Sequence, residues 1–448
     1  MNRLPDPSTS WTLYQAARGY VDVELVRTHP RPKDPEGKRA AALAFNAALG
    51  DPQRSYGAVQ VAGTSGKGSV AALIASALSA AGVRSGLHVS PYVQAFTEKT
   101  WVDGELLSAE GFASHVETVR PHATAEDQRD GPASVHGLAS LAISYLEFAE
   151  RGVELAVQET GVGGRFDLTQ GLDLRLAVIT DLGLDHLKSL GPTLERIAWH
   201  KAGIQRAGVP CVAVVGPGFE VLEREARAVG APLVPVRPEA RILARDDARV
   251  QLQSGWGPLE LGLPSSAPFW ARNAAVAVAA LECLAEAGWP LTPAAIQAGF
   301  AQRVLPGRVE PLPGGLLLDG AHNPQKARAL AAALPPGRIV AVLGSTGQRA
   351  PTEVLQILAP RLSHVVATTP HLYGKQALTG EALADAARGL GLSAEAAPDV
   401  AEALRLARAR QEGGTLLVTG SLYLVGEARD TVYPTREVVL QRTPWPAV

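Results

Sequence analysis

Residues 61–69 read Val61-Ala62-Gly63-Thr64-Ser65-Gly66-Lys67-Gly68-Ser69, and they give the most direct indication of the fold. It follows the short apolar run 58–62 and precedes the alanine-rich segment 69–81, so it links a predicted strand to a predicted helix. Glycines let the backbone turn its N–H groups toward an anion, and a helix N-terminus adds partial positive charge. Lys67 supplies a full charge for terminal phosphates, and Ser69 offers a hydroxyl to Mg²⁺. The stretch therefore predicts a phosphate-binding loop.

The order of residues in this loop differs from the usual phosphate-loop pattern. The early glycine is displaced, and Gly68 separates Lys67 from Ser69. A βα turn that is merely rich in glycine is the alternative interpretation. The strand before the loop and the helix after it favour nucleotide binding.

Outward from this loop, short apolar runs, glycine-containing turns and amphipathic segments alternate, which predicts βαβ units and a mostly parallel sheet. The strands expected first are 58–62, 83–89, 154–159, 174–180 and 209–215, with a small antiparallel addition over 230–265 and a helix over 273–287. The opening stretch through Asp51 is expected to be helical, with a loop around 29–38.

A second α/β series is expected from about Leu305. Its expected strands are 315–318, 339–343, 364–368 and 415–419, and its expected helices are 324–333, 351–358, 380–389 and 401–410. The predicted fold class is α/β: a P-loop parallel-sheet ATPase domain over residues 1–300, then a smaller Rossmann-like α/β domain over residues 301–448. Two such domains joined near Gly307 suggest a cleft between them.

Length and composition agree with this division. The 448 residues favour two to three domains, and 46% hydrophobic with 19% charged residues favours a large core over disorder. A formal net charge of −2 gives no sign of a nucleic-acid partner. No apolar run is long enough to span a bilayer, and the N-terminus has no apolar signal core, so a soluble cytoplasmic protein is expected. Cys211 and Cys283 lie in apolar contexts and are expected to be buried thiols.

An acid, a histidine and a lysine follow the predicted strands of the first domain. Glu159 ends one strand, His186 follows another, and Lys201 lies on the next helix, so all three are expected at the carboxyl edge of the sheet. Glu159 and Ser69 offer the hard oxygen ligands that Mg²⁺ prefers. For Lys201 the alternative is a surface pair with Glu195 on the same helix.

The second domain has its own strand-to-helix loop. Asp319 ends a predicted strand, Asn323 is a good helix cap, and Pro324 suits the first helical position. Plain helix capping explains Asn323 and Pro324 but leaves Asp319 and His322 unexplained.

Taken together, these segments resemble the folylpolyglutamate synthase and dihydrofolate synthase family, which belongs to the Mur ligase superfamily. The segments that carry the resemblance run in family order: 63–69 (GTSGKGS), 90–92 (SPY) with 98–108, 159–165 (ETGVGGR), 180–186 (TDLGLDH), 201–204 (KAGI), 306–308 (PGR) and 319–324 (DGAHNP).

The resemblance implies ATP and Mg²⁺ as cofactors and assigns roles by position. The implied ATP-binding residues are Gly63, Thr64, Ser65, Gly66, Lys67, Gly68, Ser69, Asn273, Arg308, Asp319 and His322. The implied metal ligands are Ser69, Glu159, His186 and Lys201, the implied catalytic residues are Lys67, His186 and Lys201, and the implied acceptor-binding residues are Ser90, Pro91 and Tyr92. Lys201 would be carbamylated by CO₂, so that it helps to hold a second Mg²⁺. A monomer is expected.

Several positions depart from the family pattern. Ser65 stands where Asn is usual, Tyr92 where His is usual, His136 where Glu is typical and His200 where an acidic residue precedes the lysine; the stretch 344–349 (GSTGQR) lacks the acidic-basic-acidic signature. The departures gather where the acceptor and glutamate would bind.

The first functional hypothesis is therefore an ATP-dependent ligase that adds L-glutamate to dihydropteroate, to folates or to both through an acyl phosphate, giving ADP and phosphate. The second is a Mur-type ligase with a non-folate acceptor. The third is a non-catalytic P-loop regulator, against which the complete set Ser69, Glu159, His186 and Lys201 argues.

Overall fold

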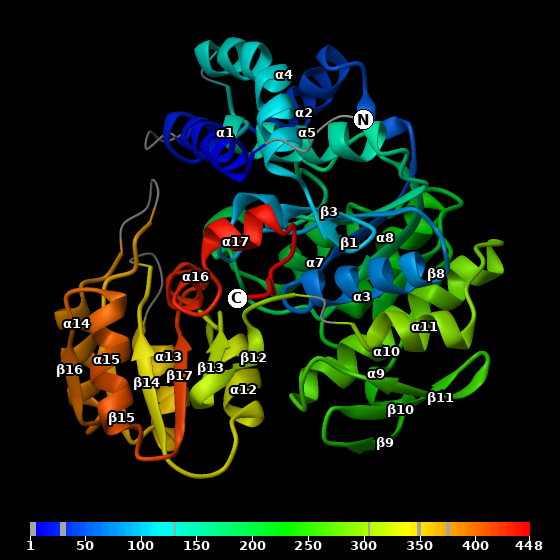
Figure 1. The fold of residues 1–448 in the computed structure, drawn as a ribbon. Coiled ribbons are helices and arrows are strands. Elements are labelled where there is room, and N and C mark those ends of the chain that lie inside the picture. Colours follow the sequence, from blue (N-terminus) through cyan, green and yellow to red (C-terminus); the bar gives the residue numbers. More distant parts are fainter. Residues whose placement is uncertain (1–5, 27–32, 130, 303–304, 347–350, 373–376) are drawn as a thin grey trace.

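The computed structural model describes residues 6–26, 33–129, 131–302, 305–346, 351–372 and 377–448. Two mostly parallel sheets and one small antiparallel sheet organise these residues (Figure 1). The eight-stranded sheet has the order β4-β3-β2-β5-β1-β6-β7-β8, and the six-stranded sheet has the order β12-β13-β17-β14-β15-β16. The predicted fold class, α/β with two successive parallel-sheet domains, is confirmed.

The strands of the large sheet are β1 (Gly57–Ala62), β2 (Ser85–His88), β3 (Thr100–Val102), β4 (Glu105–Leu106), β5 (Leu155–Glu159), β6 (Asp173–Ile179), β7 (Cys211–Val214) and β8 (Leu233–Val236). Only β3 and β4 run antiparallel to their neighbours. β1 lies between β5 and β6 and is buried along its whole length, as expected for an apolar central strand covered on both faces.

The helices of this half of the chain fall into two groups. Those near the large sheet are α3 (Lys67–Ala80), α6 (Leu187–Leu190), α7 (Leu194–Ala202), α8 (Phe219–Val229), α9 (Pro238–Arg241), α10 (Pro268–Glu286) and α11 (Pro293–Phe300). Those that gather at one end of the molecule are α1 (Pro7–Gly19), the π-helix η1 (Tyr20–Glu24), α2 (Pro35–Ala48), α4 (Ala109–Gln128) and α5 (Val135–Glu150) (Figure 1). Short 3₁₀ turns lie at η2 (Pro52–Arg54) and η3 (Phe96–Lys99).

The small antiparallel sheet consists of β9 (Ile242–Asp246), β10 (Arg249–Ser254) and β11 (Gly257–Gly262). The second parallel sheet consists of β12 (Arg308–Leu312), β13 (Leu316–Asp319), β14 (Ile339–Leu343), β15 (His364–Ala367), β16 (Ala394–Ala396) and β17 (Thr415–Thr419), with β12 antiparallel to β13. Its helices are α12 (Pro324–Ala333), α13 (Pro351–Leu358), α14 (Gly380–Gly389), α15 (Val400–Gln411), α16 (Leu422–Asp430) and α17 (Thr435–Leu440), with 3₁₀ turns at η4 (Pro313–Gly315) and η5 (Ala359–Arg361).

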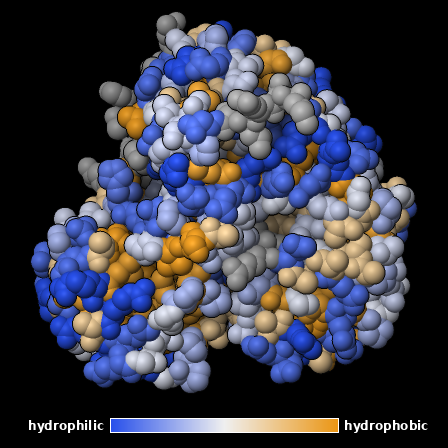
Figure 2. Space-filling model, in the orientation of Figure 1, coloured by the Kyte–Doolittle hydropathy of each residue, from blue (hydrophilic) through white to orange (hydrophobic). Residues whose placement is uncertain are grey.

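The two sheet regions form separate lobes, and a notch separates the lobe of β12–β17 from the lobe of α10 and β9–β11 on one face (Figures 1 and 2). The end of the chain returns to the first lobe. The backbone N–H of Leu106 in β4 donates to the carbonyl of Arg442 at 2.9 Å, and the Arg442 Nε atom donates back to the Leu106 carbonyl at 2.9 Å. The C-terminal segment therefore fastens the second lobe to the first.

Most strand and helix ranges agree with the predicted ones within two or three residues, but one assignment is wrong. Residues 233–236 form β8, which pairs in parallel with β7 and extends the large sheet instead of joining the antiparallel unit. Pro235 interrupts the apolar pattern there, and the edge position of β8 tolerates it. The antiparallel unit is confirmed only over 242–262.

Smaller differences concern the first loop and the cysteines. α2 begins at Pro35, inside the predicted loop, because Asp34 accepts a capping hydrogen bond from the Gly37 N–H at 2.9 Å. The loop residues 27–32 lie outside the described part of the chain. Cys211 is buried as predicted, whereas Cys283 is only partly buried. Among the described residues, no helix is both long and apolar enough to cross a membrane.

Candidate nucleotide and ligation site

The phosphate loop leaves the carboxyl end of β1 and enters α3 at Lys67, as predicted. Gly66 has φ of 83°, and a β-carbon there would lie 2.6 Å from Asn273 Oδ1, so the position requires glycine. Two contacts with the end of β6 hold the loop: Thr180 Oγ1 donates to the Ser65 carbonyl at 2.6 Å, and the Thr64 N–H donates to the Asp181 carbonyl at 2.8 Å. Asn273, on α10, thus lies against the loop, and its assignment to the nucleotide stays a prediction.

Two lysines meet at one carbonyl of this loop. Lys67 Nζ donates to the Gly63 carbonyl at 3.2 Å, and Lys201 Nζ from α7 donates to the same oxygen at 2.6 Å. The Lys201 side chain is 4% exposed, and its burial, with the like charge of Lys67, lowers its pKa to about 7. The alternative interpretation of Lys201 as a surface partner of Glu195 is therefore wrong; Glu195 instead lies 3.6 Å from Arg224.

Glu159, at the end of β5, lies between the phosphate loop and the predicted acceptor segment. Its Oε2 atom accepts the Ser90 N–H at 3.0 Å, and its Oε1 atom lies 3.9 Å from Lys67 Nζ. A β-carbon on Gly68 would lie 3.1 Å from Oε2, which places the carboxylate against the loop. Burial raises the pKa of Glu159, and the positive charge of Lys67 partly opposes that rise. Ser69 is buried in the first turn of α3.

His186 begins α6 in the left-handed conformation, with φ of 52°. Its side chain is 40% exposed, and its Nε2 atom lies 4.0 Å from Asp185 Oδ2. Within the described ranges, no three His, Cys, Asp or Glu side chains gather in a group that would hold a metal ion. The ligand set Ser69, Glu159, His186 and Lys201 therefore stays a prediction.

In the second lobe, Asp319 ends β13 and orients the neighbouring backbone. Its Oδ2 atom accepts the Val309 N–H at 2.9 Å and its Oδ1 atom accepts the Ala321 N–H at 2.8 Å. Burial raises its pKa to about 6, against the lowering effect of Arg308. Asp319 thus connects the strand of Arg308 to the loop that carries His322.

The His322 ring bridges its own loop and a lysine. Nδ1 lies 2.7 Å from the Gly320 carbonyl, which only accepts, so Nδ1 carries the proton and Nε2 accepts from Lys326 Nζ at 3.2 Å. Burial, followed by the charges of Arg308 and Lys67, lowers the pKa of Lys326 to about 8. Sequence reasoning missed Lys326. A cation in the first turn of a helix opposes the helix dipole, and that anomaly was the available signal.

One contact joins the two lobes directly at this site. Asn323 caps α12 by accepting the Lys326 N–H at 2.9 Å, and its Nδ2 atom donates to Asp185 Oδ2 at 3.0 Å. The predicted cap is confirmed, with the additional role that it docks α12 onto the loop after β6. Asp185 was not singled out in the sequence, because its contact with Asn323 forms only across the docked lobes.

On the acceptor side, Tyr92 donates its hydroxyl to Asp22 Oδ2 at 2.5 Å. Asp22 lies in the π-helix η1 and also lies 3.7 Å from His136 Nε2 and 3.3 Å from Arg18 Nε. Two positions that depart from the family pattern, Tyr92 and His136, thus converge on one carboxylate from a third element. Ser90 instead faces Glu159.

Comparison with known proteins agrees with this geometry. The family model described as the Mur ligase middle domain matches residues 61–281, and the model described as the Mur ligase, glutamate ligase domain matches residues 307–422. A dihydrofolate synthase/folylpolyglutamate synthase of Mycobacterium tuberculosis is 35% identical over 79% of this chain and 78% of its own length. One from Bacillus subtilis is 30% identical over 94% of this chain and 99% of its own length.

Solved structures give the same result for the fold. Mycobacterium tuberculosis folylpolyglutamate synthase complexed with ADP superimposes with a TM-score of 0.83 at 31% identity, covering 96% of this chain and 99% of that one. E. coli FolC in complex with DHPP and ADP superimposes with a TM-score of 0.77 at 27% identity, covering 97% of this chain and 100% of that one.

A phosphate loop with a second α/β lobe docked beside it, matched by both ligase domain models, defines a two-domain ATP-dependent ligase of the Mur type. Within that class, the chain belongs to the dihydrofolate synthase/folylpolyglutamate synthase family.

Proposed function

We propose that this chain adds L-glutamate to a folate-type acceptor with ATP and Mg²⁺, through an acyl phosphate, releasing ADP and phosphate. One observation carries the proposal: Glu159 contacts the phosphate loop at Lys67 and the acceptor segment at Ser90. The γ-phosphate and the acceptor carboxylate must meet in the first step of such a ligation, and Glu159 marks where the two binding regions come together.

The first step is transfer of the γ-phosphoryl group to a carboxylate of the acceptor. A carboxylate oxygen forms a bond to phosphorus as the bond between phosphorus and the ADP oxygen breaks. Lys67 and the loop N–H groups bind the phosphates from the first lobe, and Arg308 approaches from the second. Lys326, whose Nζ donates to His322 Nε2, adds positive charge as negative charge spreads over the phosphoryl oxygens. In the second step the glutamate amine attacks the acyl carbon, and phosphate leaves.

Mg²⁺ suits the donors at this site because Glu159 and Ser69 offer hard oxygen atoms beside the phosphate loop. Glu159 and Ser69 would hold the ion, with His186 from the loop after β6. When bound, Mg²⁺ would offset the negative charge of the phosphate groups.

Carbamylation of Lys201 belongs to the same proposal. The reaction forms a bond from Nζ to the carbon of CO₂ and releases a proton, so it needs a neutral amine. A buried amine with a pKa of about 7 is neutral in a large fraction of molecules at physiological pH. If Lys201→Ala gains no activity from small added carboxylic acids, and intact-mass analysis of the parent finds no labile adduct of CO₂, this part of the proposal fails.

A panel of acceptors tests the main proposal. ADP release is measured with dihydropteroate, with folates and with non-folate Mur-type acceptors, each with glutamate and with other amino acids, and Lys67→Ala serves as the inactive control. Stimulation by a folate-type acceptor with glutamate supports the proposal. Stimulation only by another acceptor favours the second hypothesis, and nucleotide binding without stimulated ADP release favours the regulator.

We also propose a division into residues 1–300 and 301–448, a monomeric state and a cytoplasmic location. The gap between α11 and β12 supports the division, and the family pattern supports the monomer. Light scattering on the purified protein tests the monomer.

A further inference from the structure

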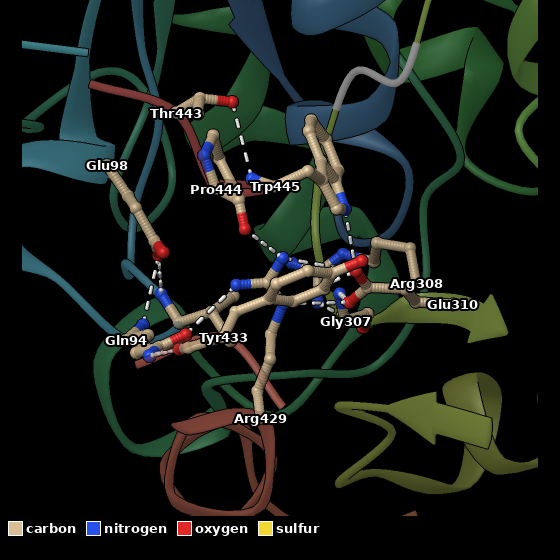
Figure 3. A network of polar contacts seen from close by, with 11 residues as sticks. Gln94, Glu98, Gly307, Arg308, Glu310, Arg429, Tyr433, Thr443, Pro444 and Trp445 are labelled. Carbon is tan, nitrogen blue, oxygen red and sulfur yellow. Dashed lines mark hydrogen bonds and ion pairs between the residues drawn. The ribbon is translucent and has the colours of Figure 1, made fainter. Parts of the chain in front are cut away.

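A buried arginine joins the two lobes away from the phosphate loop. Arg429, near the end of α16, is 0% exposed, and its guanidinium donates to the carboxylate of Glu310 at 3.2–3.3 Å and to Gln94 Oε1 at 2.9 Å (Figure 3). It also donates to the Pro444 carbonyl, and it lies 4.8 Å from the centre of the Tyr433 ring. Four segments that are distant in the sequence therefore meet at one side chain.

At one end of this contact network, Glu310 holds the turn into the second lobe. Its Oε2 atom accepts the Gly307 N–H at 2.8 Å, and its Oε1 atom accepts the Trp445 Nε1–H at 2.8 Å. Gly307 has φ of 67° and immediately precedes Arg308. The carboxylate that pairs with Arg429 thus also fixes the backbone that presents Arg308 to the site.

At the other end, Gln94 holds the acceptor segment. Its Nε2 atom donates to Asp430 Oδ1 at 3.1 Å and to Thr435 Oγ1 at 3.0 Å, while its Oε1 atom accepts from Arg429. The N–H groups of Val93 and Gln94 both donate to Glu98 Oε2, at 2.8 and 3.0 Å. This short segment follows Ser90–Tyr92 directly, so a shift of Gln94 moves the predicted acceptor contacts.

A buried pair of this kind contributes more to the relative positions of the segments that it joins than to the stability of the fold. A buried ion pair adds little net stability compared with a well-packed apolar pair, because both charges lose their hydration. Its directional hydrogen bonds nevertheless fix the segments that they join. Glu310 is 8% exposed and Gln94 is 6% exposed, so water does not compete effectively for these bonds.

We propose that Arg429 is a positioning residue for the ligation: through Gln94 it places the acceptor segment, and through Glu310 it places the turn that presents Arg308. This inference rests on the function proposed above. It explains how a side chain that lies outside the phosphate loop aligns an acceptor held by one lobe with a phosphate-binding arginine from the other. Misplacement by about 1 Å costs up to about 100-fold in rate, so the loss of this alignment is measurable.

Three variants separate positioning from stability. Gln94→Met removes the side-chain hydrogen bonds of Gln94 to Arg429, Asp430 and Thr435 and leaves the Arg429–Glu310 pair in place. The double variant Arg429→Met/Glu310→Gln removes both buried charges, so neither remains unpaired, and it keeps an oxygen for the Gly307 N–H. Trp445→Phe is the matched control, because it removes one hydrogen bond to Glu310 and leaves in place the groups that form the Glu310 bonds to Arg429 and Gly307.

We expect Gln94→Met and the double variant to lower kcat/KM for the acceptor by about tenfold or more, with the Kd of ADP for Gln94→Met within about twofold of the parent. For Trp445→Phe, both kcat/KM for the acceptor and the Kd of ADP should stay within about twofold of the parent values. A double variant with the parent's melting temperature and the parent's kcat/KM overturns the proposal. An equal loss of kcat/KM in Trp445→Phe also overturns it, because the effect is then one of general packing.

Hydrogen exchange gives a readout that does not depend on the reaction. In the double variant, the amides of Val93, Gln94 and Gly307 should exchange about tenfold faster or more, although their own acceptor positions are retained. Unchanged exchange at Val93 and Gln94 overturns the proposal. If the parent ligates no glutamate to any folate-type acceptor, the proposed function falls, whereas the exchange result still decides whether Arg429 couples the two segments.

Discussion

Replacement of Lys201 by methionine should stabilise the protein while it abolishes ligation. Burial lowers the pKa of this amine from 10.5 to about 7, so folding works against its protonation. At about 1.4 kcal/mol for each factor of ten in proton affinity, the folded state loses about 5 kcal/mol at pH 6 and about 3 kcal/mol at pH 8. The unfolded chain binds more protons between these pKa values, so the stability of the parent rises with pH across that window.

Loss of the hydrogen bond to Gly63 offsets part of this gain. Lys67 still donates to the same carbonyl at 3.2 Å, so the loss costs about 1 kcal/mol. We therefore expect Lys201→Met to exceed the parent by about 4 kcal/mol at pH 6 and about 2 kcal/mol at pH 8 in free energy of unfolding.

Urea unfolding in CO₂-free buffer measures this difference at both pH values, without nucleotide. Because both chains share every other titratable group, their difference reports Lys201 together with its coupling to neighbours such as Lys67 and Lys326. Added bicarbonate should stabilise the parent and leave the variant unchanged, because CO₂ reacts with the neutral amine, which is far more populated at Lys201 in the folded state than in the unfolded chain. A variant that is less stable than the parent at both pH values, or whose advantage does not change with pH, refutes the reasoning.

Three further perturbations test other parts of the site. Gly66→Ala places a β-carbon 2.6 Å from Asn273 Oδ1 at a φ of 83°, so the Kd of ADP should rise about tenfold or more in calorimetry, and an unchanged Kd contradicts the assigned loop geometry. Glu159→Gln keeps an acceptor for the Ser90 N–H but removes the charge proposed for Mg²⁺, so Mg²⁺-dependent ADP formation should fall about 100-fold; activity within a few-fold of the parent contradicts that role. Lys326→Met should lower kcat about tenfold or more with little change in KM for the acceptor, and a rise in KM alone would instead make Lys326 an acceptor contact.

The sequence predicted the parts of the site that one segment builds on its own. The phosphate loop, the Asn323 cap and the ends of β5 and β13 all follow from local pattern, because strand, turn and helix signals are short-range. Lys326 and Asp185 were missed because part of their environment comes from the other lobe: Asp185 accepts from Asn323, and the charge of Lys67 helps to lower the pKa of Lys326.

The wrong alternative for Lys201 has a simple physical reason. Glu195 and Lys201 are six residues apart, and side chains meet along a helix surface at spacings of three or four. Burial of α7 against the loop places Lys201 instead at the Gly63 carbonyl, a contact over 138 positions of sequence. Arg429 was likewise invisible, because its partners lie 119 and 335 positions away.

A net charge of −2 conceals strong positive charge at one place. Lys67 from α3, Lys201 from α7 and Lys326 from α12 act on one another: Lys67 and Lys326 both lower the pKa of Lys201, and Lys67 lowers that of Lys326. Docking of the second lobe therefore brings Lys326 toward a region that already holds the charge of Lys67 and the buried amine of Lys201. The bond from Asn323 to Asp185 and the carboxylates of Asp185 and Glu159 oppose this repulsion only in part, since burial and like charge still lower both pKa values. A polyphosphate supplies the missing negative charge and so offsets the repulsion among these side chains. The docked arrangement of the lobes is therefore most stable when a nucleotide lies between them.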